Sequence, residues 1–234
     1  MRERVGMRKY VCRILSALLA GFLMPVSVAA GNEVLYSWHP NESRKIAITF
    51  DDGPHPVYTP EILSILAEYG VRATFFVVGE NAEWYPELIR RELAEGHEIG
   101  NHTYSHANLR KSGYDTVLSE ILDMENAVYE NAEYRCHLLR PPGGLYGDPV
   151  CHAAEMLDYS VILWSIDTRD WAHTPRKTIV DTVLKQVKSG DIILFHDYIG
   201  GGDSPTPDAL RQIIPELLSR GYRFVTVSEL LASA

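Results

Sequence analysis

Two adjacent carboxylates follow an apolar run near the start of the chain. Asp51 and Asp52 come directly after residues 45–50 (KIAITF) and precede Gly53-Pro54. Both are hard to bury as anions unless a cation lies beside each of them. A metal ion could neutralise one and a buried arginine the other, whereas Asp-Asp-Gly is also a common turn sequence. The pair alone is therefore only a candidate site.

A pair of histidines offers further metal ligands. His102 and His106 are four residues apart, a spacing that can place two imidazoles on one face of a helical turn, within reach of one ion. Two imidazoles and one carboxylate leave an open coordination position, as in catalytic zinc sites and in non-haem iron oxygenases. The ligand types therefore do not fix the metal, and a pair at this spacing can also arise by chance.

Three more polar clusters each follow an apolar run, and they begin at Arg140, Asp167 and Leu194. The first contains two prolines, which stiffen the backbone, and Gly143, which permits close approach to a ligand. The third contains His196, which is either a general acid or a core histidine. In α/β barrels the active site is built at the carboxyl ends of the strands, so the shared position of the clusters favours a common site.

Hydrophobic periodicity predicts strands that alternate with helices. The predicted strands are 45–50, 73–78, 97–99, 137–139, 160–166, 191–195 and 222–226. The predicted helices are 60–69, 83–95, 114–131, 149–157, 175–189 and 207–219, with Thr59 and Asp115 as expected caps and Gly70 as an expected helix end. Alternation of about seven strands with helices predicts a parallel sheet or barrel.

Five motifs in this order resemble the polysaccharide deacetylases of carbohydrate esterase family 4. They are TFDDGP (49–54), HTYSH (102–106), RPPGG (140–144), DTRDW (167–171) and LFHD (194–197). The resemblance spans residues 45 to 231 and implies a distorted (β/α)7 barrel forming a single domain. It also implies a hydrolase that removes N-acetyl groups from a polysaccharide, acting on carbon–nitrogen bonds other than peptide bonds.

Carried over position by position, the resemblance implies a base and a metal centre. Asp51 is the implied general base, and Asp52, His102 and His106 are the implied ligands of one divalent metal ion. Family members usually use Zn²⁺ and also accept Co²⁺. Arg140 is implied to pair with Asp51 and set its orientation.

The resemblance also implies an acid, an oxyanion donor and an acetyl pocket. His196 is the implied general acid, oriented by Asp170. The N–H of Gly143 is the implied oxyanion donor. Many members carry an aromatic residue at position 143, so the glycine keeps the donor but removes a wall of the groove. Trp171 and Leu194 are implied to line the pocket for the acetyl methyl group.

The first 30 residues have the order of a secretory signal peptide. Five basic residues precede an apolar run from 14 to 28, and small residues end at Ala30. We therefore predict a signal peptide at 1–30, a lead-in at 31–44 and a catalytic domain at 45–234, with an uncleaved anchor as the alternative. An exported enzyme, secreted or at the cell surface, without stable membrane insertion after cleavage, is the expected form.

The net charge of the chain limits the kinds of molecule that it can bind. Removal of 1–30 would leave 17 Lys/Arg and 30 Asp/Glu, a net charge of −13, which disfavours nucleic acid and anionic lipid. The expected partner is an N-acetylated polysaccharide, with peptidoglycan preferred over chitin oligomers. O-deacetylation of xylan and carbohydrate binding without catalysis are the alternatives, and a monomer is expected. Cys136 and Cys151 could form a disulfide or remain free thiols.

Overall fold

A parallel, curled sheet organises the described part of the chain. A computed structural model describes residues 34–39 and 44–232, so the predicted signal peptide lies outside the described residues, as does half of the predicted lead-in. The described residues belong to one compact unit. The strands are β1 (Lys45–Asp51), β2 (Thr74–Val77), β3 (Glu98–Asn101), β4 (Leu138–Leu139), β5 (Ser160–Val161), β6 (Ile166–Asp167), β7 (Ile192–His196) and β8 (Arg223–Phe224). Their order is β5-β4-β3-β2-β1-β7-β6, with β8 paired to β1, and every ladder is parallel.

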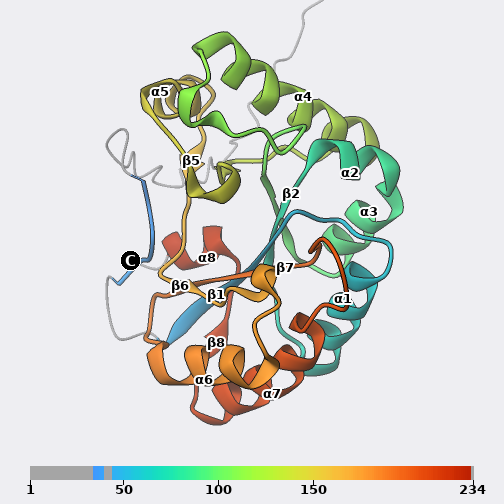
Figure 1. The fold of residues 1–234 in the computed structure, drawn as a ribbon, viewed down its shortest axis with the longest axis vertical. Coiled ribbons are helices and arrows are strands. Elements are labelled where there is room, and N and C mark those ends of the chain that lie inside the picture. The colour runs from blue at the N-terminus through green and yellow to red at the C-terminus, as the bar shows by residue number, and fades with distance from the viewer. Residues whose placement is uncertain (1–33, 40–43, 233–234) are drawn as a thin grey trace, which may run out of the picture. The chain divides into compact units, whose positions relative to one another are not determined.

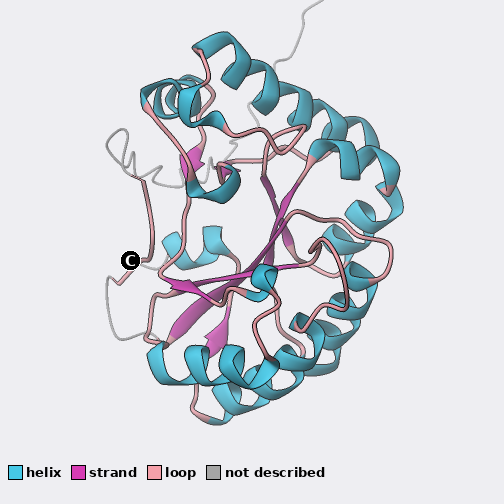
Figure 2. Ribbon diagram, viewed as in Figure 1, coloured by secondary structure: helices cyan, strands magenta, loops and turns pink. Residues whose placement is uncertain are grey.

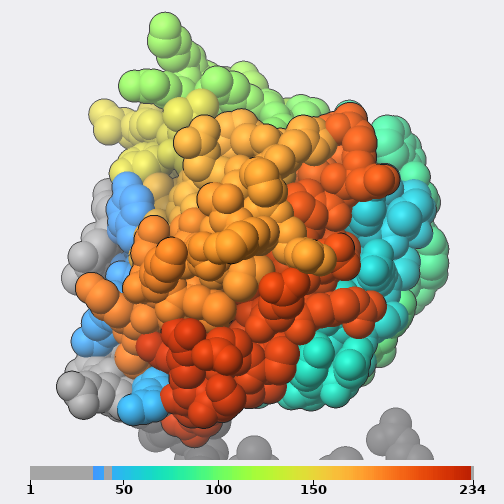
Figure 3. Space-filling model, turned by 60° about the horizontal axis from the view of Figure 1, so that its bottom comes forward, coloured from blue at the N-terminus to red at the C-terminus, as the bar shows by residue number. Residues whose placement is uncertain are grey.

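The helices lie around this sheet (Figure 1 and Figure 2). They are α1 (Tyr58–Tyr69), α2 (Gly79–Trp84), α3 (Pro86–Ala94), α4 (Tyr114–Ala132), α5 (Asp148–Met156), α6 (Arg176–Gln186), α7 (Thr206–Ser219) and α8 (Val227–Leu231). In the view of Figure 3, residues of the last third of the chain, α6 and α7 included, form most of the visible surface, with α1 beside them. The alternating parallel architecture therefore confirms the predicted (β/α)7 class.

One predicted strand divides where its backbone has other partners. The predicted strand 160–166 divides into β5 and β6, which do not pair with each other. Between them, the carbonyls of Ile162 and Leu163 accept hydrogen bonds from Arg140, at 3.2 and 2.9 Å. The Leu163 N–H donates to the carbonyl of Leu35, at 2.7 Å. The segment therefore bonds to a side chain and to the lead-in, and its bonds to the sheet change from β4 at Ile162 to β7 at Ser165.

The predicted helix 83–95 is also wrong as a single element. It is two helices, α2 and α3, separated at Tyr85, which has an extended φ of −132°. Pro86 follows, and a residue before proline is disfavoured in the helical conformation. Neither Thr59 nor Asp115 is a helix cap: α1 and α4 have no side-chain cap, and Thr59 lies inside α1. Gly70 ends α1 in the left-handed conformation, as predicted.

Two apolar clusters stabilise this arrangement. The larger joins the sheet to the surrounding helices and includes Phe50, Phe75 and Phe195. The smaller includes Phe76, Ile162, Ile192 and residues of α8. Among the described residues, no helix has both the length and the apolar character needed to cross a membrane. Both Cys136 and Cys151 are free thiols, so the disulfide is absent.

Candidate active site

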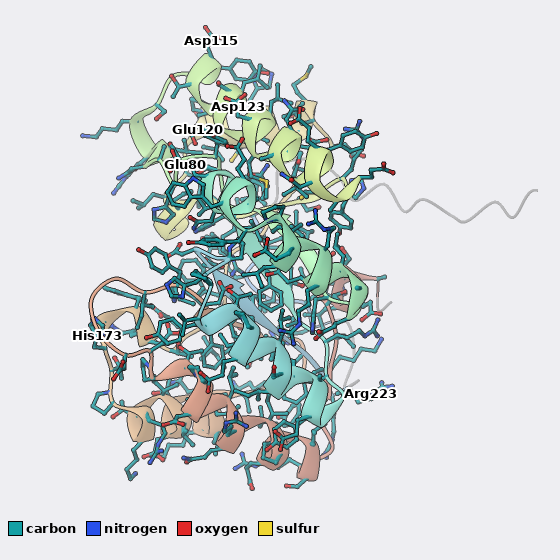
Figure 4. All side chains as sticks on the ribbon, turned by 90° about the vertical axis from the view of Figure 1, so that its right-hand side faces the viewer. Glu80, Asp115, Glu120, Asp123, His173 and Arg223 are labelled. Carbon is teal, nitrogen blue, oxygen red and sulfur yellow. The ribbon has the colours of Figure 1, made fainter. Side chains whose placement is uncertain are left out.

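The strand register brings the predicted clusters to one edge of the sheet. Asp51 is paired with His196 in the β1–β7 ladder, and Asp167 with Leu194 in the β6–β7 ladder. Parallel strands end on the same side, so the polar residues that follow them meet there. Figure 4 shows His173, just beyond the fourth motif, on the opposite side of the molecule from Arg223 at the start of β8.

Asp52, His102 and His106 form the cluster that could hold a metal. The Asp52 Oδ1 atom lies 3.2 Å from His102 Nε2 and 3.1 Å from His106 Nε2. One ligand atom from each residue lies within 4.8 Å of the others. His102 Nδ1 lies 2.7 Å from the carbonyl of Arg140, which accepts its proton and leaves Nε2 free to bind an ion. These donors and their convergence fit one divalent cation with an open coordination position.

The two histidines lie on a loop, so the helical turn suggested by their spacing is wrong. Thr103 and His106 have positive φ values of 68° and 56°. The Asn101 side chain accepts a hydrogen bond from the Thr103 N–H, at 2.9 Å. Glu120 on α4 accepts from both the N–H and the hydroxyl of Ser105, at 2.9 and 2.6 Å. Because side chains outside the loop hold these conformations, the His spacing alone could not predict them.

Asp51 is held by a buried arginine. Arg140 is fully buried and its Nη1 donates to Asp51 Oδ1, at 2.7 Å, and to the Thr49 hydroxyl, at 2.8 Å. Its guanidinium carbon lies 3.9 Å from the centroid of the Phe76 ring. The other Asp51 oxygen lies 3.7 Å from His102 Nε2. The arginine thus compensates the buried carboxylate and directs the free oxygen toward the histidine cluster.

His196 and Asp170 form the second charged pair. The Nδ1–H of His196 donates to Asp170 Oδ1, at 2.8 Å, and the other Asp170 oxygen accepts from the His196 N–H and the Thr206 hydroxyl, at 2.8 and 2.5 Å. Burial alone would lower the pKa of His196, but the hydrogen bond and charge of Asp170 outweigh it and raise the pKa to about 9. The ring is therefore cationic at neutral pH, as a proton donor must be.

The remaining predicted residues differ in exposure. Leu194 is buried, whereas Trp171 is 48% exposed. Gly143 is exposed and has a φ of 61°. A Cβ at this position would meet nothing closer than 3.7 Å, so the backbone conformation, not crowding, favours glycine here.

Comparison with known proteins identifies the family. The family model described as "Polysaccharide deacetylase" matches residues 39–162. The chain belongs to this family. A peptidoglycan-N-acetylglucosamine deacetylase of Bacillus cereus is 48% identical over 195 residues, covering 82% of this chain and 90% of the relative. A chitooligosaccharide deacetylase of Sinorhizobium fredii is 39% identical, covering 76% and 87%.

A solved deacetylase structure agrees with the fold. The crystal structure of the Bc1960 peptidoglycan N-acetylglucosamine deacetylase, in complex with 4-naphthalen-1-yl-N-oxidanyl-benzamide, superposes with a TM-score of 0.82. It is 38% identical, and the match covers 86% of this chain and 94% of that one. The predicted deacetylase fold is therefore confirmed.

Sequence reasoning gave Asp197 no role, although it lies at the same edge of the sheet. Asp197 is 1% exposed, its N–H donates to the carbonyl of Asp51 at 3.2 Å, and Oδ2 accepts from the Thr59 hydroxyl at 2.5 Å. A side chain at Gly53 would collide with this carboxylate. Asp197 thus joins the end of β7 to the end of β1 and to α1. Its position directly after His196 was the only signal in the sequence.

Proposed function

We propose that this chain is an exported, metal-dependent hydrolase that removes N-acetyl groups from N-acetylglucosamine units of an extracellular polysaccharide, with peptidoglycan as the preferred polymer. The observation that carries the proposal is the meeting of three groups at one edge of the sheet. They are the Asp52 ligand cluster, the Asp51–Arg140 pair and the His196–Asp170 pair. The similarity to a peptidoglycan-N-acetylglucosamine deacetylase supports this choice of polymer.

Asp52, His102 and His106 would hold the metal, which we propose to be Zn²⁺, with Co²⁺ as a substitute. When bound, such an ion lowers the pKa of water to about 7 and polarises the acetyl carbonyl. Asp51 then accepts the proton of the attacking water. Arg140 donates a hydrogen bond to one oxygen of Asp51, so the other oxygen is available as the base.

His196 would complete the reaction by giving a proton to the departing nitrogen. An amine is a poor leaving group unless it is protonated, and the cationic ring supplies that proton. Asp170 holds the Nδ1–H of His196, which leaves Nε2 to face the substrate. The Gly143 N–H would stabilise the oxyanion, and Trp171 and Leu194 would contact the acetyl methyl group.

A screen of acetate release separates the candidate substrates. Metal-loaded protein is incubated with intact cell wall, chitin, N-acetylglucosamine oligomers and acetylated xylan. We expect release from cell wall with free amines formed. Release from the oligomers but not from cell wall would overturn the choice of polymer and favour the chitooligosaccharide alternative, which a 39% identical relative supports. Release from xylan alone would indicate an O-acetyl esterase, and binding without release would indicate a non-catalytic protein.

Export rests on the first 30 residues, which carry the pattern of a signal peptide. A cell-wall substrate requires the enzyme to act outside the membrane, so the two proposals agree. We propose cleavage after Ala30 and a monomeric mature protein. N-terminal sequencing of the protein recovered from the medium or cell surface would check the first point, and light scattering the second.

A further inference from the structure

Three aromatic rings stack at the rim of the candidate active site. His55 lies between two tyrosines: its ring centroid is 5.0 Å from that of Tyr58 and 5.1 Å from that of Tyr198. The interplanar angles are 20° and 10°, so the three rings are nearly parallel. One face of Tyr198 covers His55, yet Tyr198 is 41% exposed. Because one face of the ring is covered by His55, the other face is the one that can meet a ligand.

Chain connectivity places this stack beside the proposed catalytic groups. His55 follows Asp51 by four residues, and Tyr198 follows His196 by two. Asp51 and His196 are register partners in the β1–β7 ladder. The two sides of the stack therefore come from the loops that follow the strands carrying the proposed base and acid.

The stack is rigid. The Thr59 hydroxyl accepts from the His55 N–H, at 2.7 Å, and donates to Asp197. The Tyr58 hydroxyl donates to the carbonyl of Gly202 and accepts from the Ser204 N–H, both at 3.2 Å. These bonds tie the loop after β1 to the loop after β7.

We infer that the exposed face of Tyr198, supported by His55 and Tyr58, binds a pyranose ring of the polymer next to the sugar that loses its acetyl group. A pyranose presents a face of C–H groups, which packs on an aromatic face, while its hydroxyls remain in water. The rim position suits a neighbouring unit of a chain whose reacting unit lies between Asp51 and His196. This inference rests on the proposed function, since it requires a sugar polymer as substrate.

Substrate length provides the test. We compare kcat/KM for acetate release from N-acetylglucosamine oligomers of two and five units in wild type, Tyr198→Ala and Tyr198→Trp. The wild type should prefer the longer oligomer, Tyr198→Ala should lose roughly three- to tenfold of that preference, and Tyr198→Trp should retain it. Tyr129→Ala is the matched control: Tyr129 is 42% exposed but lies on α4, in contact with Arg135. Equal length preference in wild type and Tyr198→Ala would overturn the inference.

A binding measurement separates this inference from the proposed function. Calorimetry with the five-unit oligomer is performed in an Asp51→Asn background, so that the ligand stays intact. We expect that adding Tyr198→Ala to this background raises the Kd roughly three- to tenfold, and that adding Tyr129→Ala leaves it unchanged. That result would support the inference even if the wild type released no acetate. Absence of acetate release would overturn only the deacetylase proposal. An unchanged Kd would show that Tyr198 does not bind the neighbouring sugar, and it would leave the deacetylase proposal intact.

Discussion

At the scale of single residues, the candidate site depends on which groups neutralise each buried charge. Asp51 and Asp52 are adjacent in sequence but have different partners. Arg140 neutralises the first, and two imidazoles contact the second. Burial would raise the pKa of Asp52, but hydrogen bonds from His102 and His106 outweigh it and lower the pKa. This difference in partners is the reason why we propose different tasks for the two carboxylates.

The pH dependence of activity should depend on Asp170. Burial opposes the cationic form of His196, and Asp170 raises its pKa to about 9, so the acid stays protonated until the pH rises through that value. In Asp170→Asn the hydrogen bond and the charge of Asp170 are lost, and only the smaller effects of the Asp51 and Asp52 charges still oppose that of burial, so the pKa of His196 should fall. We expect the basic limb of the kcat profile to move to lower pH and kcat at pH 7 to fall about 10- to 100-fold.

The matched control for that profile is Asp167→Asn, in the same motif. The Asp167 carboxylate accepts from the Arg169 N–H, at 2.8 Å, and the ring of His196 bonds to Asp170 instead. The basic limb of the kcat profile of Asp167→Asn should therefore lie at the same pH as in the wild type. A basic limb that stays in place in Asp170→Asn would show that His196 is not the titrating acid.

At the scale of elements, α4 positions the loop that carries His102 and His106. Glu120 projects from α4 and holds Ser105 between the two histidines with both carboxylate oxygens. Figure 4 shows Glu120 close to Glu80 and Asp123, on the part of the molecule formed by α2 and α4. Loss of this anchor should free the loop and weaken metal binding without removing any ligand.

We expect Glu120→Gln to weaken Zn²⁺ binding by about tenfold, the usual effect of removing a group that orients a metal ligand. Competition with a chelating dye measures the Kd. Asp123→Asn removes one negative charge from the same helix, but its partner there is Ser119, so its Kd should remain near the wild-type value. Equal losses in both variants would mean that the charge of the helix, rather than the anchor, determines the affinity.

The sequence could predict most of this arrangement, because apolar runs mark strands and the polar residues that end them share one edge. The prediction of Asp51, Asp52, Arg140 and His196 as neighbours depends only on that rule. Glu120 could not be predicted, since in sequence it is one more polar residue on the exposed face of an amphipathic helix. The division of the predicted strand 160–166 into β5 and β6 could not be predicted either. Between these strands the backbone bonds to Arg140, a residue distant in sequence.

At the scale of the whole molecule, a buried carboxyl group lies in the core without a function in the proposed reaction. Glu92 on α3 is fully buried, and neither of its carboxylate oxygens has a hydrogen-bond partner. Burial, with a smaller effect of Asp197, raises its pKa well above the usual value. The folded protein therefore holds this proton at pH values where the unfolded chain has lost it, and stability falls as pH rises above about 4.3.

Replacement of Glu92 by methionine should stabilise the protein by about 1–3 kcal/mol at pH 7, because the cost of burying the carboxyl disappears. The gain should shrink toward pH 4. Denaturant unfolding at several pH values measures it. Glu95→Gln, which breaks only the ion pair with Arg91 near the end of α3, should change stability by less than about 1 kcal/mol. A destabilised Glu92→Met would show that the carboxyl has a partner that stabilises it.

The division of labour between Asp51 and Asp52 is the centre of the account, and metal content measured together with turnover tests it directly. Asp52→Ala should lose the metal and, with it, acetate release. Asp51→Asn should bind one equivalent of metal, as the wild type does, and lose turnover only. Loss of metal from Asp51→Asn, or wild-type acetate release by either variant, would contradict the assignment.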